Sequence, residues 1–353
     1  MRNEIPRPFI VPVFIPHAGC PHQCIFCNQH VITGASSNSA VLQKGLAAYI
    51  RNFLQFKKPL RKPVQISFYG GNFLGLKKSF RNELLETAMP FVQSGYADGF
   101  RFSTRPDTIT PLHMEGVRRF PVQTIELGVQ SMDDRVLQLS RRGHTAQRTR
   151  KACEILHDLE YEIGLQMMIG LPGDSEDTTL KTAERMAELY PAFVRIYPTV
   201  VLKNSPLADW YRQGRYSALS LEAAVALVKK LYLFFQEKHI PVIRMGIQAS
   251  KEPAGQDGIV AGPYHPAFGH LVHSEIFLDK AIAALHRHAG PISRVVLRVH
   301  PRSISKAKGL HNINVKRLAA LFDIGTIEWV QDESLPLNGL RVDTPPFHSK
   351  RKR

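Results

Sequence analysis

Six short runs of β-forming residues alternate with helical patterns through the first two-thirds of the chain, and this alternation limits the possible fold more than any other feature. The helical stretches, such as residues 41–56, carry apolar residues at spacings of three and four. A repeated strand–helix order predicts an α/β fold in which right-handed crossovers join parallel strands. The runs are almost continuously apolar, which predicts burial on both faces of the sheet. They cover residues 9–17, 64–71, 99–105, 124–131, 162–172 and 193–201.

The predicted strand ends carry the segments that are chemically most unusual. In parallel α/β folds of either the open or the barrel type, the functional site lies at the carboxyl ends of the strands. We therefore expect the site along this edge of the sheet. The segments are HAGCPHQC, YGGN, STRPD, GVQS, GLPG and YPTVVLKNSPL.

The pattern changes after the helix predicted over residues 221–239. Short strands and helices follow without the strand–helix repeat, which is typical of an α+β domain. We place the boundary near residue 236, so that residues 1–236 form the main domain and residues 237–353 form a smaller, basic α+β domain. Its last six residues, HSKRKR, predict a disordered tail.

The chain is strongly basic. Its 353 residues include 46 Lys and Arg against 30 Asp and Glu, which gives a net charge of +16. Such a field favours a nucleic-acid partner, and a basic enzyme without one is the alternative. No apolar run approaches the roughly 20 residues that span a bilayer, and the first residues lack a signal-peptide pattern. The interpretation is a cytoplasmic protein with no membrane segment.

Three of the four cysteines lie within eight residues, as Cys20-x3-Cys24-x2-Cys27 in the loop after the first predicted strand. Three soft thiolates so close together favour a zinc ion or an iron–sulfur cluster over a disulfide framework. A four-iron cluster held by three cysteines would leave one iron open to a small ligand. A zinc site would need a fourth protein ligand. Three histidines are available for it: His17, His22 and His30.

The cysteine loop, with Phe26 just before its last cysteine, resembles the signature of the radical SAM superfamily. The resemblance implies a partial (β/α)6 barrel in which Cys20, Cys24 and Cys27 ligate a 4Fe-4S cluster and S-adenosylmethionine binds the fourth iron. An external one-electron reductant then drives cleavage of S-adenosylmethionine to methionine and a 5′-deoxyadenosyl radical, which abstracts a substrate hydrogen. The protein positions the cofactor and the substrate.

Five further segments resemble one subfamily, the radical SAM half of the Elongator catalytic subunit, which modifies the wobble uridine of tRNA. They follow the order of that subfamily over roughly residues 9–215. The residues after the core contain no Gly-x-Gly-x-x-Gly turn of an acetyl-CoA loop, so the resemblance does not extend to an acetyltransferase domain. The segments are residues 103–107, 125–131, 141–145, 168–174 and 195–207.

The resemblance also implies contacts at the methionine and adenine ends of the cofactor. Phe26 is expected near the adenine, while Gly70 and Gly71 let the backbone approach the methionine end together with Asn72. Asn72 stands where the family has glutamate. Its amide oxygen can still accept a hydrogen bond from the methionine ammonium but adds no charge.

Further contacts are implied along the next strand ends. Ser103, Thr104 or Arg105 is expected near the ribose or the carboxylate, Gln130 and Gln166 near the ribose, Arg142 at the carboxylate and Met168 in the adenine slot. The alternatives are a solvated or phosphate-facing charge for the two arginines and plain core packing for Met168.

The C-terminal domain offers two weaker patterns. His265, His270 and His273 leave a second metal site open, although helix capping, core hydrogen bonding or phosphate contact is the preferred interpretation. Three arginines recur every four residues in a β-like run, which suits contact with an RNA backbone; a solvated edge is the alternative. They are Arg294, Arg298 and Arg302.

Together these features predict a radical SAM enzyme that acts on a base in tRNA or another nucleic acid. One alternative is a radical SAM enzyme with a small organic substrate, such as a tetrapyrrole or a cofactor precursor. Another is a non-catalytic RNA-binding protein that is stapled by zinc. A steep salt dependence of substrate binding separates the RNA substrate from the small one, and bound iron separates the enzyme from the zinc protein.

Overall fold

The computed structural model describes residues 8–15, 19–21, 24–28, 39–57, 62–247, 258–288 and 292–343, and for residues 39–44 it describes the backbone alone. The chain divides into two compact units. The first comprises Met1–Ala224 and Leu233–Tyr264, and the second comprises Val225–Tyr232 and His265–Arg353.

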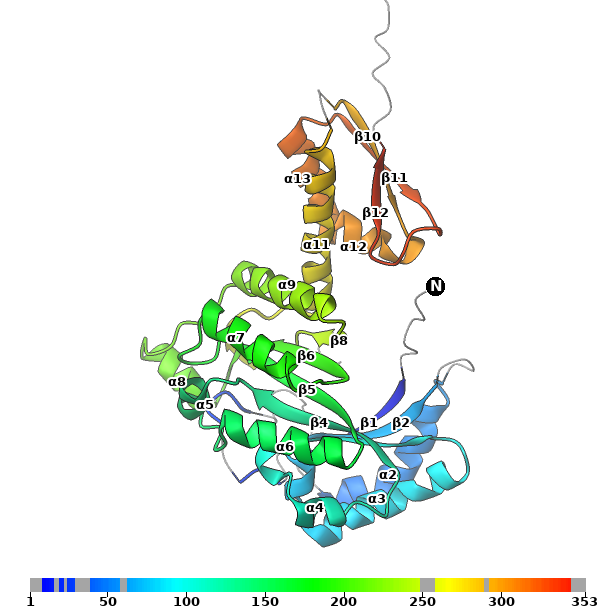
Figure 1. The fold of residues 1–353 in the computed structure, drawn as a ribbon, viewed down its shortest axis with the longest axis vertical. Helices are drawn as coiled ribbons and strands as arrows, with labels where there is room; N and C mark the ends of the chain where they lie inside the picture. The colour runs from blue at the N-terminus through cyan, green and yellow to red at the C-terminus, as the bar shows by residue number, and fades with distance from the viewer. Residues whose placement is uncertain are drawn as a thin grey trace, which may run out of the picture. The chain divides into compact units, whose positions relative to one another are not determined.

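The first unit contains a seven-stranded sheet in which all neighbouring strands are parallel. The strands follow chain order across the sheet, which curls into a partial barrel (Figure 1). The predicted α/β class and partial barrel are confirmed. All six predicted strands are present, and a seventh, β8, extends the sheet. The strands are β1 (Phe9–Ile15), β2 (Val64–Gly70), β3 (Gly99–Thr104), β4 (Val122–Gln130), β5 (Glu162–Ile169), β6 (Phe193–Pro198) and β8 (Val242–Met245).

The two units of the structure do not meet at residue 236, where the sequence places the domain boundary, because β8 belongs to the sheet of the first unit. The segment that contains β8 lies beyond the last strand–helix repeat, so its local pattern places it in the C-terminal domain. In the structure β8 pairs in parallel with β6, and the unit that holds the sheet continues to Tyr264. The middle of the preceding helix, α9 (Leu221–Glu237), belongs to the second unit. Strand pairing is a long-range interaction, which a local pattern does not report.

Polar caps begin several helices of the first unit. The side chain of Thr145 accepts a hydrogen bond from a backbone amide at the start of α6 (Ala146–Asp158), and Ser175 forms a capping box at the start of α7 (Glu176–Ala187).

A short antiparallel pair joins β7 (Val201–Leu202) to β9 (Ile259–Ala261). The other helices are α2 (Ser39–Leu54), α3 (Lys78–Gln93), α4 (Pro111–Glu115), α5 (Asp134–Leu139) and α8 (Pro206–Arg212), with 3-10 turns η1 (Phe73–Gly75) and η2 (Pro106–Thr108).

The two faces of the sheet differ in chemistry, which corrects the expectation that both are apolar. Phe68 and Phe102 lie on the apolar face and stack on Phe73 at centroid distances of 5.0 and 4.8 Å. The strand order follows the chain order, so right-handed crossovers place the helices on one face, and only that face needs apolar side chains. The opposite face, here called the polar face, carries a band of hydrophilic residues in register across the strands. The band includes Ser67, Tyr69, Arg101, Ser103, Glu126, Gln166, Arg195 and Tyr197, and the apolar Met168 lies on the same face.

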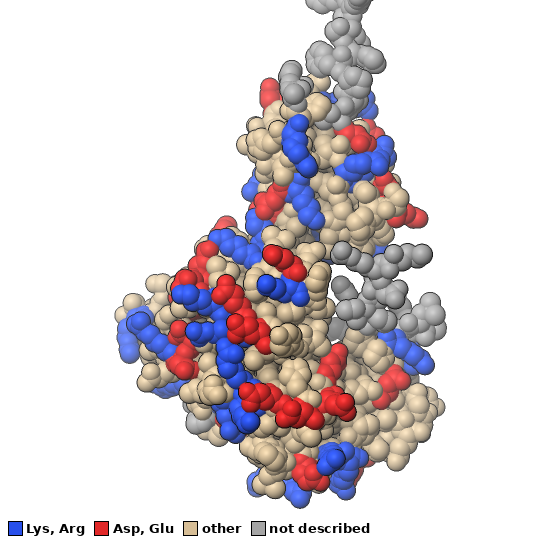
Figure 2. Space-filling model, viewed as in Figure 1, with Lys and Arg blue, Asp and Glu red and all other residues tan. Residues whose placement is uncertain are grey.

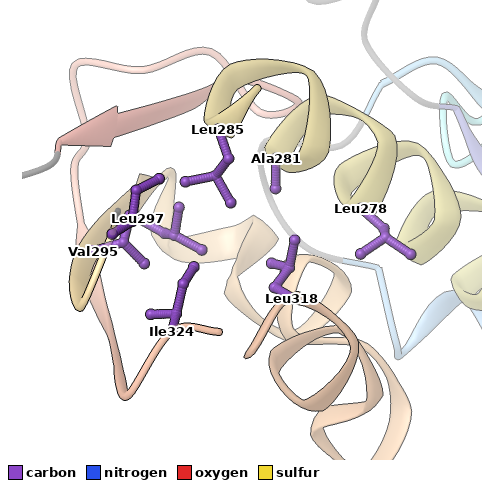
Figure 3. Close-up of a cluster of buried hydrophobic side chains, with 8 residues drawn as sticks. Leu278, Ala281, Leu285, Val295, Leu297, Leu318 and Ile324 are labelled. Carbon is purple, nitrogen blue, oxygen red and sulfur yellow. The ribbon is translucent and has the colours of Figure 1, made fainter. Parts of the chain in front are cut away.

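The second unit is the predicted α+β domain. Its central strand β10 (Arg294–Val299) pairs in parallel with β11 (Thr326–Gln331) and antiparallel with β12 (Leu340–Asp343). The helices α11 (Phe268–Leu285), α12 (Ile304–Lys308) and α13 (Ile313–Phe322) accompany the sheet, with 3-10 turns η3 (Pro301–Ser303) and η4 (Leu310–Asn312). Apolar side chains from α11, α13 and β10 form its core (Figure 3). None of the described helices has both the length and the apolar composition needed to cross a membrane.

Candidate active site at the strand ends

The cysteine loop follows β1 and is attached to the barrel through Ile25. The backbone of Ile25 donates to the carbonyl of Ser140 at 3.3 Å and accepts from the amide of Leu207 at 2.8 Å. Its side chain is fully buried in a small apolar cluster, and the half-buried Phe26 packs against that cluster. These contacts fix the loop where the strands end. Cys20 is exposed, Cys24 buried and Cys27 half-buried, and none of the three takes part in a disulfide.

Two buried arginines bring positive charge to the loop. Arg142 Nη1 lies 3.2 Å from Cys24 Sγ, and Arg105 Nη1 lies 3.9 Å from it. Asp107 orients Arg105 through a 2.9 Å ion pair. The Cys20 side chain is exposed, yet the protein around it reduces its hydration and raises the pKa of its thiol; the charges of Arg105 and Arg142 oppose that rise. Adjacent guanidinium groups stabilise thiolates, the form that binds metal.

One hydrogen-bond donor of Arg142 has no partner among the described residues. Its Nη2 donates to the carbonyl of Gly128, whereas its buried Nε has no hydrogen-bond partner among the described residues. A buried donor without a partner costs about 1–3 kcal/mol. An acceptor oxygen of a ligand would remove this cost, and the carboxylate predicted for Arg142 is such an acceptor.

The end of β2 forms a tight glycine turn. Gly70 has φ +127°, and a Cβ there would lie 2.0 Å from the carbonyl oxygen of Ile15. The amide of Gly71 donates to the same oxygen at 3.3 Å. Only glycine permits both the backbone angle and the close approach of the β1 end. The predicted turn residues therefore stand directly beside the strand that leads into the cysteine loop.

The structure places Asn72 differently from the sequence interpretation, in which its amide faces the cofactor. The side chain is buried, and both ends of its amide are engaged within the chain. Nδ2 donates to the carbonyl of Gly19 at 2.9 Å, while Oδ1 accepts from Thr104 Oγ1 at 2.6 Å and from the amide of Arg105 at 3.1 Å. Thr104 is buried by the same contacts, and Ser103 lies half-buried on the polar face. Asn72 thus joins the start of the cysteine loop to the end of β3.

The predicted ribose and adenine contacts lie on neighbouring strands. Gln166 Nε2 donates to Gln130 Oε1 at 3.2 Å, and Gln130 adopts a left-handed φ of 71° where the register between β4 and β5 shifts. Gln166 and Met168 are half-buried two residues apart on β5 and point to the polar face. The geometry brings these three residues together, which agrees with contacts to one ligand.

A buried charge cluster on the polar face was missed in the sequence. The two oxygens of Glu126 accept from Arg101 Nε and from Arg195 Nη1, each at 2.6 Å. Arg195 lies between two aromatic rings, 5.5 Å from the centroid of Tyr69 and 5.3 Å from that of Tyr197. Burial raises the pKa of Tyr69 to about 12 and also raises that of Tyr197, so both phenols stay protonated at neutral pH. The alternation of polar residues in QISFY, RFS and RIY is the signal that reveals this face.

The C-terminal histidines take part in the structure of the second unit itself. His265 Nδ1 accepts a backbone hydrogen bond at 3.0 Å just before α11, and His270 Nε2 lies 3.1 Å from Ser305 Oγ. His273 packs edge-on against Tyr232, with 5.0 Å between the ring centroids. Within the described parts of the chain no three His, Cys, Asp or Glu side chains converge as an ion site. The three histidines thus make local hydrogen bonds and a ring contact, whereas α11 begins without a side-chain cap.

The donor set of the loop fits an iron–sulfur cluster with an external ligand. It combines three thiols with two arginines beside Cys24 and an Arg142 Nε that has no hydrogen-bond partner among the described residues, next to the glycine turn at the end of β2. Thiolates that hold four irons stand farther apart than those that hold one ion, so convergence on a single point is not required. The histidines proposed for a zinc site lie outside the described residues: His17, His22 and His30.

Comparison with known proteins identifies the family of the chain. Residues 14–186 match the model of the radical SAM superfamily, and residues 191–277 match the radical SAM C-terminal domain. A protein of Methanocaldococcus jannaschii named as uncharacterized is 28% identical over 62% of this chain and 70% of its own length. The tRNA uridine(34) acetyltransferase of Dehalococcoides mccartyi is 26% identical over 56% of this chain and 50% of its own length.

The fold also resembles a solved structure, that of the archaeal Elp3 from Methanocaldococcus infernus. The TM-score is 0.57 at 19% identity, over 78% of this chain and 63% of that one. The chain spans about half the length of the tRNA uridine(34) acetyltransferases that it matches. The two family models together cover about three-quarters of the chain. The chain belongs to the radical SAM superfamily, whose members bind a 4Fe-4S cluster and S-adenosylmethionine.

Proposed function

We propose that this radical SAM enzyme acts on tRNA and abstracts hydrogen from one of its bases. The similarity to tRNA uridine(34) acetyltransferases supports an RNA substrate, as does the net charge of +16. The observation that carries the chemical part is the contact of Arg142 and Arg105 with Cys24, beside a polar sheet face. A thiolate site next to hydrophilic side chains suits a cofactor on one side and a polar substrate on the other.

Each residue of the site has a separate task in this proposal. Cys20, Cys24 and Cys27 hold the cluster, and Arg142 Nε donates to the carboxylate of S-adenosylmethionine. Gln130 and Gln166, already joined to each other, present their remaining amide atoms to the ribose hydroxyls. When bound, the cluster and S-adenosylmethionine supply a 5′-deoxyadenosyl radical after one-electron reduction by an external reductant.

The polar face is suited to a substrate rich in acceptor atoms. Arg101 and Arg195 share the single carboxylate of Glu126, which leaves one positive charge in excess in this cluster. The protonated phenols of Tyr69 and Tyr197 offer hydrogen-bond donors and flat surfaces beside it. The carbonyl groups of a nucleobase would match these donors, and its ring would match the aromatic surfaces.

The proposal predicts that tRNA stimulates cofactor cleavage. We expect the anaerobically reconstituted enzyme, with dithionite and S-adenosylmethionine, to form more 5′-deoxyadenosine when bulk tRNA is added. The stimulation should fall steeply with KCl concentration, because binding to a polyanion releases counterions. Product would be measured by mass spectrometry, with nuclease-digested tRNA as the control. Stimulation by a small-molecule extract alone, with no salt dependence, would instead support a small organic substrate.

A further inference from the structure

The second unit contains a strongly basic stretch that neither family model reaches. The two models end at residues 186 and 277. Beyond them, residues 286–322 contain eight Lys and Arg and no Asp or Glu. The family match therefore gives no role to residues 286–322.

Three of the eight cations are neutralised by carboxylates from other elements. Arg294 pairs with Glu328 at 2.9 Å, and Arg298 pairs with Asp343 at 2.6 Å. Arg317 on α13 pairs in the same way with a glutamate of α11. Of the three arginines predicted as a basic stripe, Arg294 and Arg298 on β10 thus pair with carboxylates of the neighbouring strands, whereas Arg302 lies beyond the strand on η3.

Three other cations of the stretch form no ion pair within the described residues. Arg302 and Lys316 are exposed and Lys308 is half-buried. They lie on η3, on α12 and on α13, which follow one another along the chain and pack together. We call Arg302, Lys308 and Lys316 the free cation set. Their charge is available to a partner.

The backbone that carries the free cation set is held by buried polar contacts. Ser303 Oγ donates to the carbonyl of Leu337, and His300 Nδ1 accepts from the amide of Arg302 at 3.1 Å. The buried amide of Asn314 donates to the carbonyl of Ala307 at 3.1 Å and to Ser274 on α11. A backbone fixed in this way presents its charges without a large ordering cost on binding.

We propose that the free cation set binds the phosphate backbone of the RNA substrate. The inference rests on the proposed function, because it takes RNA to be the partner. Three unpaired cations are spaced along a backbone that hydrogen bonds hold in place. Ser305 and His311, which carry a hydroxyl and an imidazole that can also contact phosphate, are close to them in sequence. α12, with five residues and a buried Ala307, has no apolar face of its own for a bilayer, and the vesicle measurement in the test below separates RNA from an anionic lipid surface.

The test compares two triple variants with the same change of charge in the same unit. One replaces the free cation set: Arg302→Gln, Lys308→Gln and Lys316→Gln. The matched control replaces the paired cations: Arg294→Gln, Arg298→Gln and Arg317→Gln. Both would be made in the full, cluster-loaded enzyme, and far-ultraviolet circular dichroism would verify the fold. Binding of bulk tRNA would be measured by filter retention over a range of KCl concentrations.

We expect the first variant to bind tRNA roughly tenfold more weakly at moderate salt and to reduce the log–log salt slope by about 2, since each phosphate contact contributes roughly 0.7–0.9. The control should stay within about twofold of wild type. Equal losses of tRNA binding in both variants, or no loss in either, would overturn the proposal. Binding to anionic phosphatidylserine vesicles would be measured in parallel, and a first variant that loses vesicle binding but keeps tRNA binding would also overturn it. If wild type bound no tRNA at all, the proposed function itself would fail.

Discussion

Replacing Glu126 by Gln should lower the free energy of unfolding of the first unit by about 3–5 kcal/mol, the usual cost of breaking a buried ion pair. Glu126 is 2% exposed and accepts from Arg101 and Arg195 at 2.6 Å each. An amide keeps the shape but leaves two buried guanidinium groups without a counter-charge. Urea unfolding followed by circular dichroism would measure the loss. Glu86→Gln, which removes an exposed pair with Arg119, is the control and should cost under about 1 kcal/mol.

The same carboxylate makes stability depend on pH. Burial alone would raise the pKa of Glu126, but the charges and hydrogen bonds of Arg195 and Arg101 outweigh it and lower the pKa below its ordinary value of 4.5. The folded state therefore binds fewer protons than the unfolded state. The stabilisation is fully present above the ordinary value and is lost as the pH falls through the folded pKa. As the pH is lowered from about 6 through the folded-state pKa of Glu126, the free energy of unfolding should therefore fall more for wild type than for Glu126→Gln. An equal fall in both proteins would contradict a lowered pKa for Glu126.

Replacing Asn72 by Asp should impair loading of the cluster even though the two side chains have the same shape. An amide is needed because the side chain must donate to the Gly19 carbonyl and accept from Thr104 and Arg105. Aspartate retains the acceptors but sets a carboxylate oxygen against a carbonyl. The loss of a buried hydrogen bond costs about 1–3 kcal/mol, which corresponds to roughly tenfold weaker binding of the cluster. The lost bond is the one to Gly19, the residue that precedes Cys20.

The measurement is iron per chain after reconstitution, together with the electron paramagnetic resonance spectrum of the reduced cluster with and without S-adenosylmethionine. We expect less bound iron and a spectrum that responds more weakly to S-adenosylmethionine. Asn338→Asp, a change of the same kind on the half-buried loop before β12, is the control. Normal iron content and a normal spectral response in the Asn72 variant would rule out its assigned role in positioning the cysteine loop.

Much of the fold follows from local patterns, because strand–helix alternation and strand-end motifs are local features. Cys20, Cys24 and Cys27, the Gly70 turn and Gln130 all occur where the expected strands end. The residues that local patterns misplace are those whose partners are distant in the chain. β8 joins the sheet through β6, and Arg298 meets Asp343 across a strand pair.

Asn72 and the polar face illustrate a second limit. A sequence shows that Asn72 follows two glycines, but the partners of its amide depend on how Gly19 and Thr104 approach it. The polar face was visible as alternation in strands such as RFS, yet the apolar half of each strand dominates a hydropathy pattern. Which face carries helices depends on the order of strands in the sheet, a property of the whole topology.

The most direct test of the central claim is reductive cleavage of S-adenosylmethionine at the cysteine loop. Anaerobically reconstituted wild type, Cys24→Ala and Cys153→Ala would each receive dithionite and S-adenosylmethionine, and 5′-deoxyadenosine would be measured by mass spectrometry. Cys153 is a buried core thiol on α6 whose pKa burial raises to about 12, so it is the matched control. We predict product from wild type and from Cys153→Ala and none from Cys24→Ala. Absence of product from wild type shown to hold four irons would contradict the account.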